Sequence, residues 1–277
     1  MSKKILFPTD FSVASKNAFI YALQLADSIN AEIVTIHVYE PPQAHFVNAV
    51  AYLHEIYDVT ELATFENYRD EVPALRTVAE VNNLGHIKMS HVLIAGDTVS
   101  QIRKMAENDY FDIVIMGTKG GTSFRESVFG TVATKVMNEV KSLILVIPAD
   151  CNYQAIKKIL FLTQYKSVDT ESFKKIVSFS KTVNAHLDCL RIISSHDNEA
   201  IDAREDWKQL ADSETVNFHL IEGSDTEGLT LEFIKSNAIN LVSMHVYHKN
   251  FFEKFFETSI SKKLALHINI PLLAIHE

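Results

Sequence analysis

Residues 3–11 of the chain read KKILFPTDF, and residues 157–165 read KKILFLTQY. The shift of 154 positions that superposes these segments also places Asn30-Ala31 on Asn184-Ala185. Each segment begins with two lysines, followed by the start of an apolar run typical of a buried strand. Repetition on this scale indicates that the chain contains two diverged copies of one structural unit.

The later parts of the two copies also align, but at a different shift. Residues 113–147 superpose without a gap on residues 241–275, at a shift of 128. Since the shift falls from 154 to 128, the first copy carries about 26 extra residues, and their expected place is the stretch from Tyr39 to about Tyr68. This aromatic insertion could form a lid or an interface. Pro73 is expected to begin or bend the helix that follows it.

Short apolar runs alternate with amphipathic segments in each copy. Phe19, Leu23 and Ala26 fall at helical spacing, whereas the runs rich in Ile, Val and Leu lack strict polar alternation, as strands covered on both faces do. The strands expected in the first copy cover residues 4–8, 32–38, 88–95, 112–116 and 143–147.

Strands that alternate with helices predict parallel pairing through right-handed crossovers. The fold class is therefore α/β, with two tandem doubly wound five-stranded parallel-sheet domains at residues 1–150 and 151–277. Trp207, the single tryptophan, is expected to anchor a helix of the second domain to its sheet.

Composition and charge exclude several classes of protein. Apolar residues make up 47% of the chain and charged residues 22%, with no apolar run near the roughly 18 residues of a membrane span. The apolar stretch after the first lysines is too short for a signal peptide, so a cytoplasmic protein is expected. Cys151 and Cys189 lack metal-ligand spacing.

The net charge of −9 is acidic in both halves. Residues 1–150 hold 12 basic and 18 acidic side chains, and residues 151–277 hold 14 and 17. A nucleic-acid partner is not expected, because such proteins usually present a cationic stripe to the phosphates.

Glycines gather after the fourth strand of the first copy. Gly117, Gly120, Gly121 and Gly130 are four of the eight glycines in the chain, and Thr131 opens the helix that follows. Residues without a Cβ can adopt positive φ and let backbone N–H groups approach an anion. A phosphate at the start of this helix would also meet its unsatisfied N–H groups and positive dipole end. Basic side chains in the loop, Lys119 and Arg125, would either neutralise the phosphates or be solvated.

The G-x-x-G, nine residues, then G-T pattern resembles the ATP-binding signature of the universal stress protein family. The resemblance extends over the first copy. It includes the opening KILFPTDF, the second strand ending in Ile36-His37-Val38, the turn Ala95-Gly96-Asp97, the strand DIVIMG at 112–117 and the closing LVIP at 145–148.

The resemblance implies a Rossmann-like fold of the adenine nucleotide alpha hydrolase type that binds ATP, with or without Mg²⁺. Asp10 would lie nearest the ribose and base. Position 119 often carries histidine in the family, and this chain has Lys119 instead. The residues implied around the adenosine are Pro8, Thr9, Asp10, Val38 and Met116, and those around the phosphates are Gly117, Lys119, Gly120, Gly130, Thr131 and Val132.

The second copy has lost the glycines and the acidic residue of this pattern. The aligned replacements are His245 for Gly117, His248 for Gly120, Lys249 for Gly121, Thr258-Ser259 for Gly130-Thr131, Leu162 for Pro8 and Gln164 for Asp10. ATP is therefore expected in the first copy alone. The two histidines lack a third ligand, so no metal is expected. The phenylalanine-rich segment Phe251–Phe256 would fill the vacated pocket, pack between the copies or dock a partner.

Three functions remain to be compared. The first is an ATP-binding stress-response sensor, in which residues 143–147 and 271–275 pair within the chain to form a pseudo-dimer, as members of the family commonly pair through their last strands. The second is a slow ATPase, which is disfavoured because no carboxylate or histidine is placed to activate water. The third is a nucleotide-free scaffold that recruits partners. The sequence leaves open a protein partner and further association of two chains.

Overall fold

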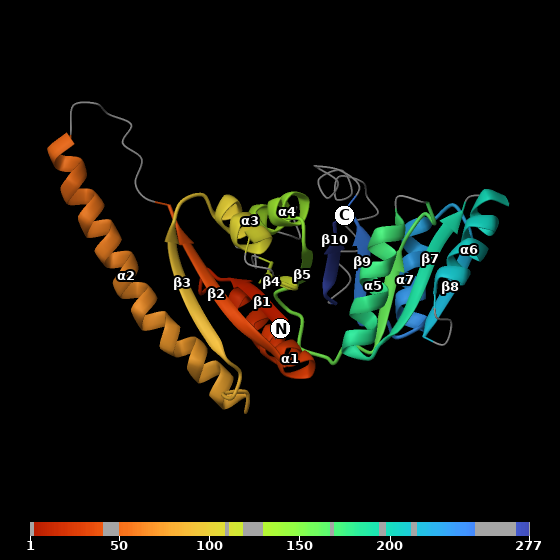
Figure 1. The fold of residues 1–277 in the computed structure, drawn as a ribbon, viewed down its shortest axis with the longest axis horizontal. Coiled ribbons are helices and arrows are strands. Elements are labelled where there is room, and N and C mark those ends of the chain that lie inside the picture. The colour runs from red at the N-terminus through yellow and green to blue at the C-terminus, as the bar shows by residue number, and fades with distance from the viewer. Residues whose placement is uncertain are drawn as a thin grey trace.

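The computed structural model places two α/β units side by side in one chain (Figure 1). Their strands lie in the middle, and helices cover both sides. The structure describes residues 3–40, 50–108, 111–118, 130–166, 169–193, 198–211, 215–246 and 270–276.

Ten strands form in the described residues, five from each copy. The strands expected for the first copy are confirmed to within one residue at each end. In the first copy they are β1 (Lys3–Pro8), β2 (Ala31–Tyr39), β3 (Met89–Ala95), β4 (Ile113–Gly117) and β5 (Leu143–Ile147). In the second copy they are β6 (Lys158–Leu162), β7 (His186–Ile193), β8 (Val216–Glu222), β9 (Leu241–His245) and β10 (Leu272–Ile275).

Helices alternate with these strands. The described helices of the first copy are α1 (Val13–Ile29), α2 (Val50–Val81), α3 (Thr98–Asn108) and α4 (Thr131–Glu139). Those of the second copy are α5 (Thr170–Val183), α6 (Asn198–Leu210) and α7 (Thr226–Ser236).

All ten strands belong to one sheet, in the order β3-β2-β1-β4-β5-β10-β9-β6-β7-β8. Pairing is parallel within each copy, as expected for right-handed crossovers. The copies meet where β5 pairs antiparallel with β10, with Val146 opposite Leu272 and Leu143 opposite Ile275. The predicted pairing of the last strands within the chain is therefore confirmed.

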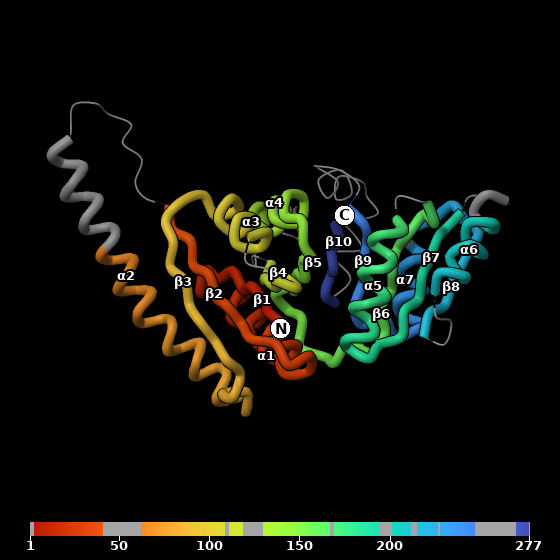
Figure 2. The backbone as a smooth tube through the Cα atoms, viewed as in Figure 1, coloured from red at the N-terminus to blue at the C-terminus, as the bar shows by residue number. Residues whose placement is uncertain are grey.

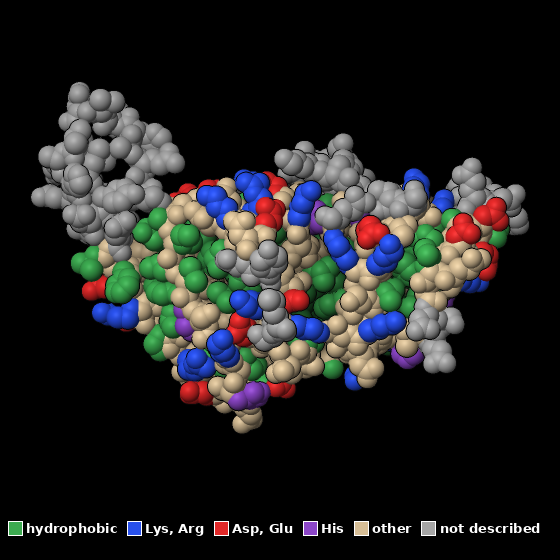
Figure 3. All heavy atoms as spheres, in the orientation of Figure 1, with side chains coloured by type: hydrophobic (Ala, Val, Ile, Leu, Met, Phe, Trp, Pro, Cys, Tyr) green, Lys and Arg blue, Asp and Glu red, His purple; other side chains and the backbone are tan. Residues whose placement is uncertain are grey.

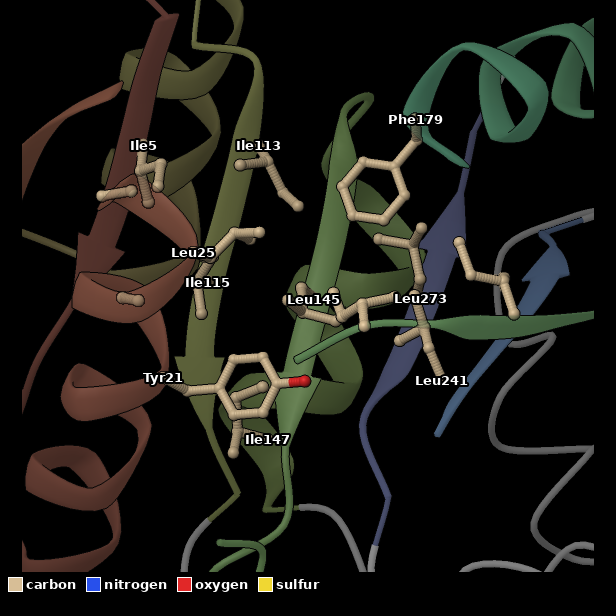
Figure 4. Close-up of a cluster of buried hydrophobic side chains, with 14 of the residues drawn as sticks. Ile5, Tyr21, Leu25, Ile113, Ile115, Leu145, Ile147, Phe179, Leu241 and Leu273 are labelled. Carbon is tan, nitrogen blue, oxygen red and sulfur yellow. The ribbon is translucent and has the colours of Figure 1, made fainter. Parts of the chain in front are cut away.

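Each face of the sheet carries one apolar cluster that runs through both copies. On one face, side chains of α1, α2, α5 and α6 pack on the strands. On the other face, α3, α4 and α7 do so. Figure 4 shows that Leu145 of β5 and Leu273 of β10 lie next to each other in the first cluster, so the two copies share a core.

Aromatic packing anchors α6 as the sequence predicts. Trp207 is buried, and its ring lies 4.6 Å from Phe173 on α5 and 6.4 Å from Phe161 on β6. Tyr165 meets the same indole edge-on at 5.3 Å. Such aromatic pairs add to the stabilisation that burial of their area provides.

The extra residues of the first copy mainly lengthen one helix. Helix α2 has 32 residues, whereas α6 in the corresponding place has 13. Figure 2 shows α2 beyond β3, at the end of the molecule away from the second copy. Pro73 lies inside this helix and does not begin it. Residues 41–49 of the insertion lie outside the described residues.

The connector between the copies, residues 148–157, lies against α1. The side-chain amide of Asn17 donates to the carbonyls of Ala149 (3.1 Å) and Cys151 (2.9 Å). Tyr21 packs edge-on against Tyr153 and donates its hydroxyl proton to a connector carbonyl at 3.3 Å. The connector is therefore tied to the first copy, and a domain boundary at residue 150 stays a prediction.

The surface mixes charges of both signs. On the face in Figure 3, lysine and arginine side chains lie among acidic and apolar ones. In the described part of the chain, no helix is both long enough and apolar enough to cross a membrane.

Candidate functional site

A cavity of about 240 Å³ opens at the carboxyl ends of β1 and β4. These strands are neighbours at the point where the strand order of the first copy reverses, which is where open parallel sheets take their ligands. Its lining residues are Pro8, Thr9, Asp10, Ser12, Ser15, Ile36, His37, Val38, Thr98, Ile102, Met116, Gly117, Thr118, Gly130, Thr131, Val132 and Ala133.

The loop after β1 is held by short side chains that bond to its own backbone. The Thr9 hydroxyl accepts the N–H of Phe11 at 3.0 Å and lies 2.9 Å from the Ser15 hydroxyl. Asp10 accepts the N–H of Ser12 at 3.0 Å, and Ser12 caps α1 by accepting the N–H of Ser15. Such bonds fix a turn and a helix start together. The exposed Asp10 carboxylate is thus placed at the cavity.

An aromatic group supports this loop. His37 of β2 bonds through Nδ1 to the Thr9 carbonyl at 2.8 Å, and a carbonyl only accepts, so the proton lies on Nδ1. The ring of Phe11, which has a φ of 59°, lies 4.9 Å from His37, and Tyr68 of α2 stacks on His37 at 6.3 Å. The lengthened helix therefore reaches the base of the candidate site.

The opposite wall is formed by the end of β4 and the start of α4. The buried Thr118 continues the ladder by donating its N–H to the Ile147 carbonyl at 2.9 Å. Gly130 is the N-cap of α4 and makes no side-chain cap bond, so the first N–H groups of the helix lack a partner from that residue. Thr131 and Val132 are exposed beside them.

The two described glycines of this group, Gly117 and Gly130, do not adopt positive φ. Gly130 has a φ of −58°, an ordinary value for any residue, and Gly117 lies in β4. A Cβ at Gly117 would lie 2.8 Å from the Ala14 carbonyl oxygen and 3.3 Å from the Ala18 Cβ. Gly117 is thus required for the close packing of α1 on β4, and this packing brings the two walls of the cavity together.

The structure brings together nine of the eleven residues named from the sequence, and two fall outside the described residues. Those that line the cavity are Pro8, Thr9, Asp10, Val38, Met116, Gly117, Gly130, Thr131 and Val132. Lys119 and Gly120 are not among the described residues, nor are their loop neighbours Gly121 and Arg125.

Several lining residues were not named from the sequence. Ser12 could have been identified as the N-cap of the first helix, with Ser15 three residues later at the capped N–H. Thr98 could have been identified as the first residue of the third helix. Thr118 carries no pattern of its own, and its place follows from the strand register alone.

The matching place in the second copy holds buried side chains. His245 fills the position of Gly117 and exposes 2% of its surface, with Nδ1 2.5 Å from the hydroxyl of the buried Ser172. The buried carboxylate of Asp169, which aligns with Ser15, accepts from the Thr163 hydroxyl at 2.8 Å. His248 and Phe251–Phe256 lie outside the described residues.

Within the described ranges, no three His, Cys, Asp or Glu side chains are arranged to bind a metal ion. Among the described lining residues, the polar groups are hydroxyls, backbone amides, the His37 imidazole and the Asp10 carboxylate, a set suited to an organic ligand with hydroxyl and anionic groups.

The doubly wound sheet and the cavity at its switch point define an α/β protein of the Rossmann-like class. Within this class, the model of the universal stress protein family matches residues 1–148. The chain belongs to the universal stress protein family.

Curated relatives and solved structures agree with this assignment. Universal stress protein MJ0577 of Methanocaldococcus jannaschii is 25% identical over 156 residues, which cover 53% of this chain and 95% of that protein. Universal stress protein MJ0531 of the same organism is 29% identical over 146 residues, covering 52% and 81%. The crystal structure of a universal stress protein from Archaeoglobus fulgidus covers 100% of this chain and 97% of its own, with a TM-score of 0.72 and 18% identity. The last likeness shows that the fold of the whole chain, both copies included, occurs in a solved structure.

Proposed function

We propose that the protein is a stress-response sensor that binds ATP in the cavity of the first copy and does not turn it over. The observation that supports this most directly is the meeting, in one cavity, of the Asp10 carboxylate with the amino-terminal turn of α4. A carboxylate can accept bonds from ribose hydroxyls, whereas a helix start favours anions. The two ends of a nucleotide have these two chemistries.

The cavity suits a nucleotide in size and wall chemistry. Its 240 Å³ is slightly below the roughly 300 Å³ at which small-molecule pockets commonly begin, so it would enclose a nucleoside and leave phosphates at the α4 side. Apolar side chains of Ile36, Val38 and Met116 would border the base. Thr131 would add a hydroxyl donor to the amides at the phosphate end. Mg²⁺ would accompany the phosphates.

The position of Asp10, the acidic side chain among the described lining residues, supports a sensor over an enzyme. Asp10 belongs to the loop after β1, whereas the anion-binding end of the cavity is the start of α4. A general base for hydrolysis must be within hydrogen-bond reach of the attacking water at the terminal phosphate. We expect phosphate release no faster than background, and turnover well above background would favour the slow ATPase.

Nucleotide in the first copy alone is the finer part of the proposal. His245 and Ser172 occupy the place where α1 and β4 pack around Gly117 in the first copy. Removing this buried pair from its contacts to admit a ligand would leave polar groups without partners, at a cost of about 1–3 kcal/mol each. One ATP per chain is therefore expected. Localisation in the cytoplasm stays a prediction from the sequence.

The test is equilibrium binding of ATP to the full chain, with and without Mg²⁺, by calorimetry. Gly130→Val places a branched side chain at the mouth of α4 and should abolish binding, whereas Gly85→Val, in an exposed turn on another part of the chain, should leave it unchanged. A stoichiometry of one per chain is expected. Wild-type protein that takes up no adenine nucleotide at millimolar concentration would refute the proposal and leave the nucleotide-free scaffold.

A further inference from the structure

His276, the residue that follows β10 in the second copy, donates a hydrogen bond to α4 in the first copy. Its Nε2 lies 2.6 Å from the carbonyl oxygen of Met137. Because a carbonyl only accepts, the proton of this bond lies on Nε2. Both residues are buried, with His276 9% exposed and Met137 fully enclosed. The bond therefore crosses the junction of the two copies in a region shielded from water.

The accepting carbonyl belongs to the last turn of α4. The N–H of Val140 bonds back to Val136 at 3.0 Å, and the helix ends at Glu139. Carbonyls of a last turn have no N–H ahead of them within the helix, and a histidine donor can satisfy one of them. His276 thus caps the carboxyl end of a helix that belongs to the other copy.

The capping side chain is itself firmly placed. Ile275 pairs with Leu143 across the β5–β10 junction, and Lys175 of α5 donates a hydrogen bond to the His276 carbonyl. Burial lowers the pKa of His276 and the hydrogen bond to Met137 raises it in part, but the neighbouring His245 lowers it further, so the net shift is downward and favours the neutral ring. A neutral ring with its proton on Nε2 has one donor, and Met137 takes it.

The other end of the same helix lines the cavity. Gly130, Thr131, Val132 and Ala133 form that wall, one to two turns from the capped carbonyl. Ala133 and Val136 are buried in the apolar cluster, so the position of α4 depends on its packing and on its two ends.

We propose that His276 is a positioning residue for the nucleotide site: it holds α4 so that the amino-terminal turn meets the phosphates. This inference rests on the proposed function and assigns the second copy a part in the site of the first. By thermodynamic reciprocity, phosphates bound at α4 would in turn stabilise the junction between the copies.

Phosphate dependence separates this role from general stabilisation. Adenosine would bind to the loop after β1 and to Val38 and Met116, and it has no phosphate to reach α4. A displaced α4 should therefore lower the affinity for ATP and leave the affinity for adenosine unchanged. A general loss of folding would lower the affinity for both ligands to the same extent.

The experiment measures ATP and adenosine affinities of the full chain for the wild type, His276→Leu and His276→Gln. His276→Leu removes the donor and should lower the affinity for ATP about tenfold, which is the effect of one buried hydrogen bond. The affinity for adenosine should change less than twofold. His276→Gln keeps an N–H donor and should recover part of the loss. The matched control is His186→Leu at the exposed start of β7, which should bind both ligands as the wild type does.

Hydrogen exchange of the α4 amides without nucleotide is the second readout. Amides of residues 134–140 should exchange faster in His276→Leu than in the wild type, because a helix without its cap frays. Unchanged exchange, or equal losses of ATP and adenosine affinity, would overturn the inference. Wild-type protein that binds neither ligand would refute the proposed function, while the exchange result would still show whether His276 holds α4.

Discussion

Replacing Gly117 by alanine adds a single methyl group where β4 and α1 are closest. The Cβ would lie 2.8 Å from the Ala14 carbonyl oxygen, 3.1 Å from the Ala14 carbonyl carbon and 3.3 Å from the Ala18 Cβ. Favourable non-bonded contacts between carbon atoms begin near 3.5 Å. Two of the three atoms are helix backbone, so a rotamer change cannot relieve the contact. Helix α1 or strand β4 must move.

The size of the effect follows from the cost of overpacking. Extra methyl or methylene groups in a close-packed core usually cost about 1–3 kcal/mol. For a chain of this size, that corresponds to a fall in melting temperature of roughly 3–10 °C. The same displacement moves Ser15, which lines the cavity one residue from Ala14, so ATP should also bind more weakly.

The measurement is the thermal midpoint of Gly117→Ala beside Gly85→Ala, each with and without ATP. At Gly85 the atom nearest to the added methyl group would be the Glu80 Cγ at 3.2 Å, in a flexible exposed side chain, so little change is expected. If Gly117→Ala melts within a degree of the wild type, the close approach of α1 to β4 does not limit this position. The reason given for the glycine would then be wrong.

Two further predictions concern the second copy. Burial would raise the pKa of Asp188, but hydrogen bonds from His219 and Asn217 outweigh it and hold the pKa below its usual range. The stabilisation is therefore present above about pH 4 and is lost as pH falls toward the folded-state pKa, so Asp188→Asn should flatten the decline in melting temperature between pH 5 and pH 3. Tyr165→Phe removes a hydroxyl whose one proton is shared between the carbonyls of Cys189 (2.8 Å) and His219 (3.1 Å), and should lower the free energy of unfolding by about 1–2 kcal/mol without changing ATP affinity. An equal or greater pH dependence in the first variant, or a loss of ATP affinity in the second, would contradict these expectations.

The strands could be predicted because burial on both faces leaves a simple pattern in the sequence. Runs such as Ile113–Gly117 and Leu143–Ile147 are apolar throughout, and the repeat gave two independent examples of each. The pairing of the last strands was predicted from the family resemblance, and the shift of 128 only identified which segment of the second copy is its last strand. Alignment of the copies also identified His245 as the residue in the place of Gly117.

Helix α2 shows where local signals were insufficient. Pro73 disfavours a helix interior, since it lacks an N–H and crowds the preceding turn. The sequence therefore predicted a helix that begins or bends there. In the structure, Tyr68 lies before Pro73 in the helix and stacks on His37. Leu75 and Ala79 follow it and are buried in the core. Tertiary contacts on both sides of the proline therefore hold the helix together.

The polar contacts of the second copy were beyond the reach of spacing rules. Ser172 and His245 are 73 positions apart, and nothing in either local sequence links them. The replacement of Gly117 by His245 and of Asp10 by Gln164 predicted that the nucleotide site is lost, but not which contacts the new side chains make. What replaced the site depends on which helix face meets which strand, and this is set by the assembled sheet.

The difference between the copies also makes the contacts across their junction asymmetric. The shift of 128 that aligns the last strands places Pro148 opposite His276 in the repeat. Proline has neither a side-chain donor nor a backbone N–H, so Pro148 has no donor with which to cap a helix as His276 caps α4. In a dimer of two identical units, any such contact would occur twice or not at all. Two copies in one chain can differ in sequence, so one copy can line the cavity while the other supplies His276 to the helix that forms its wall.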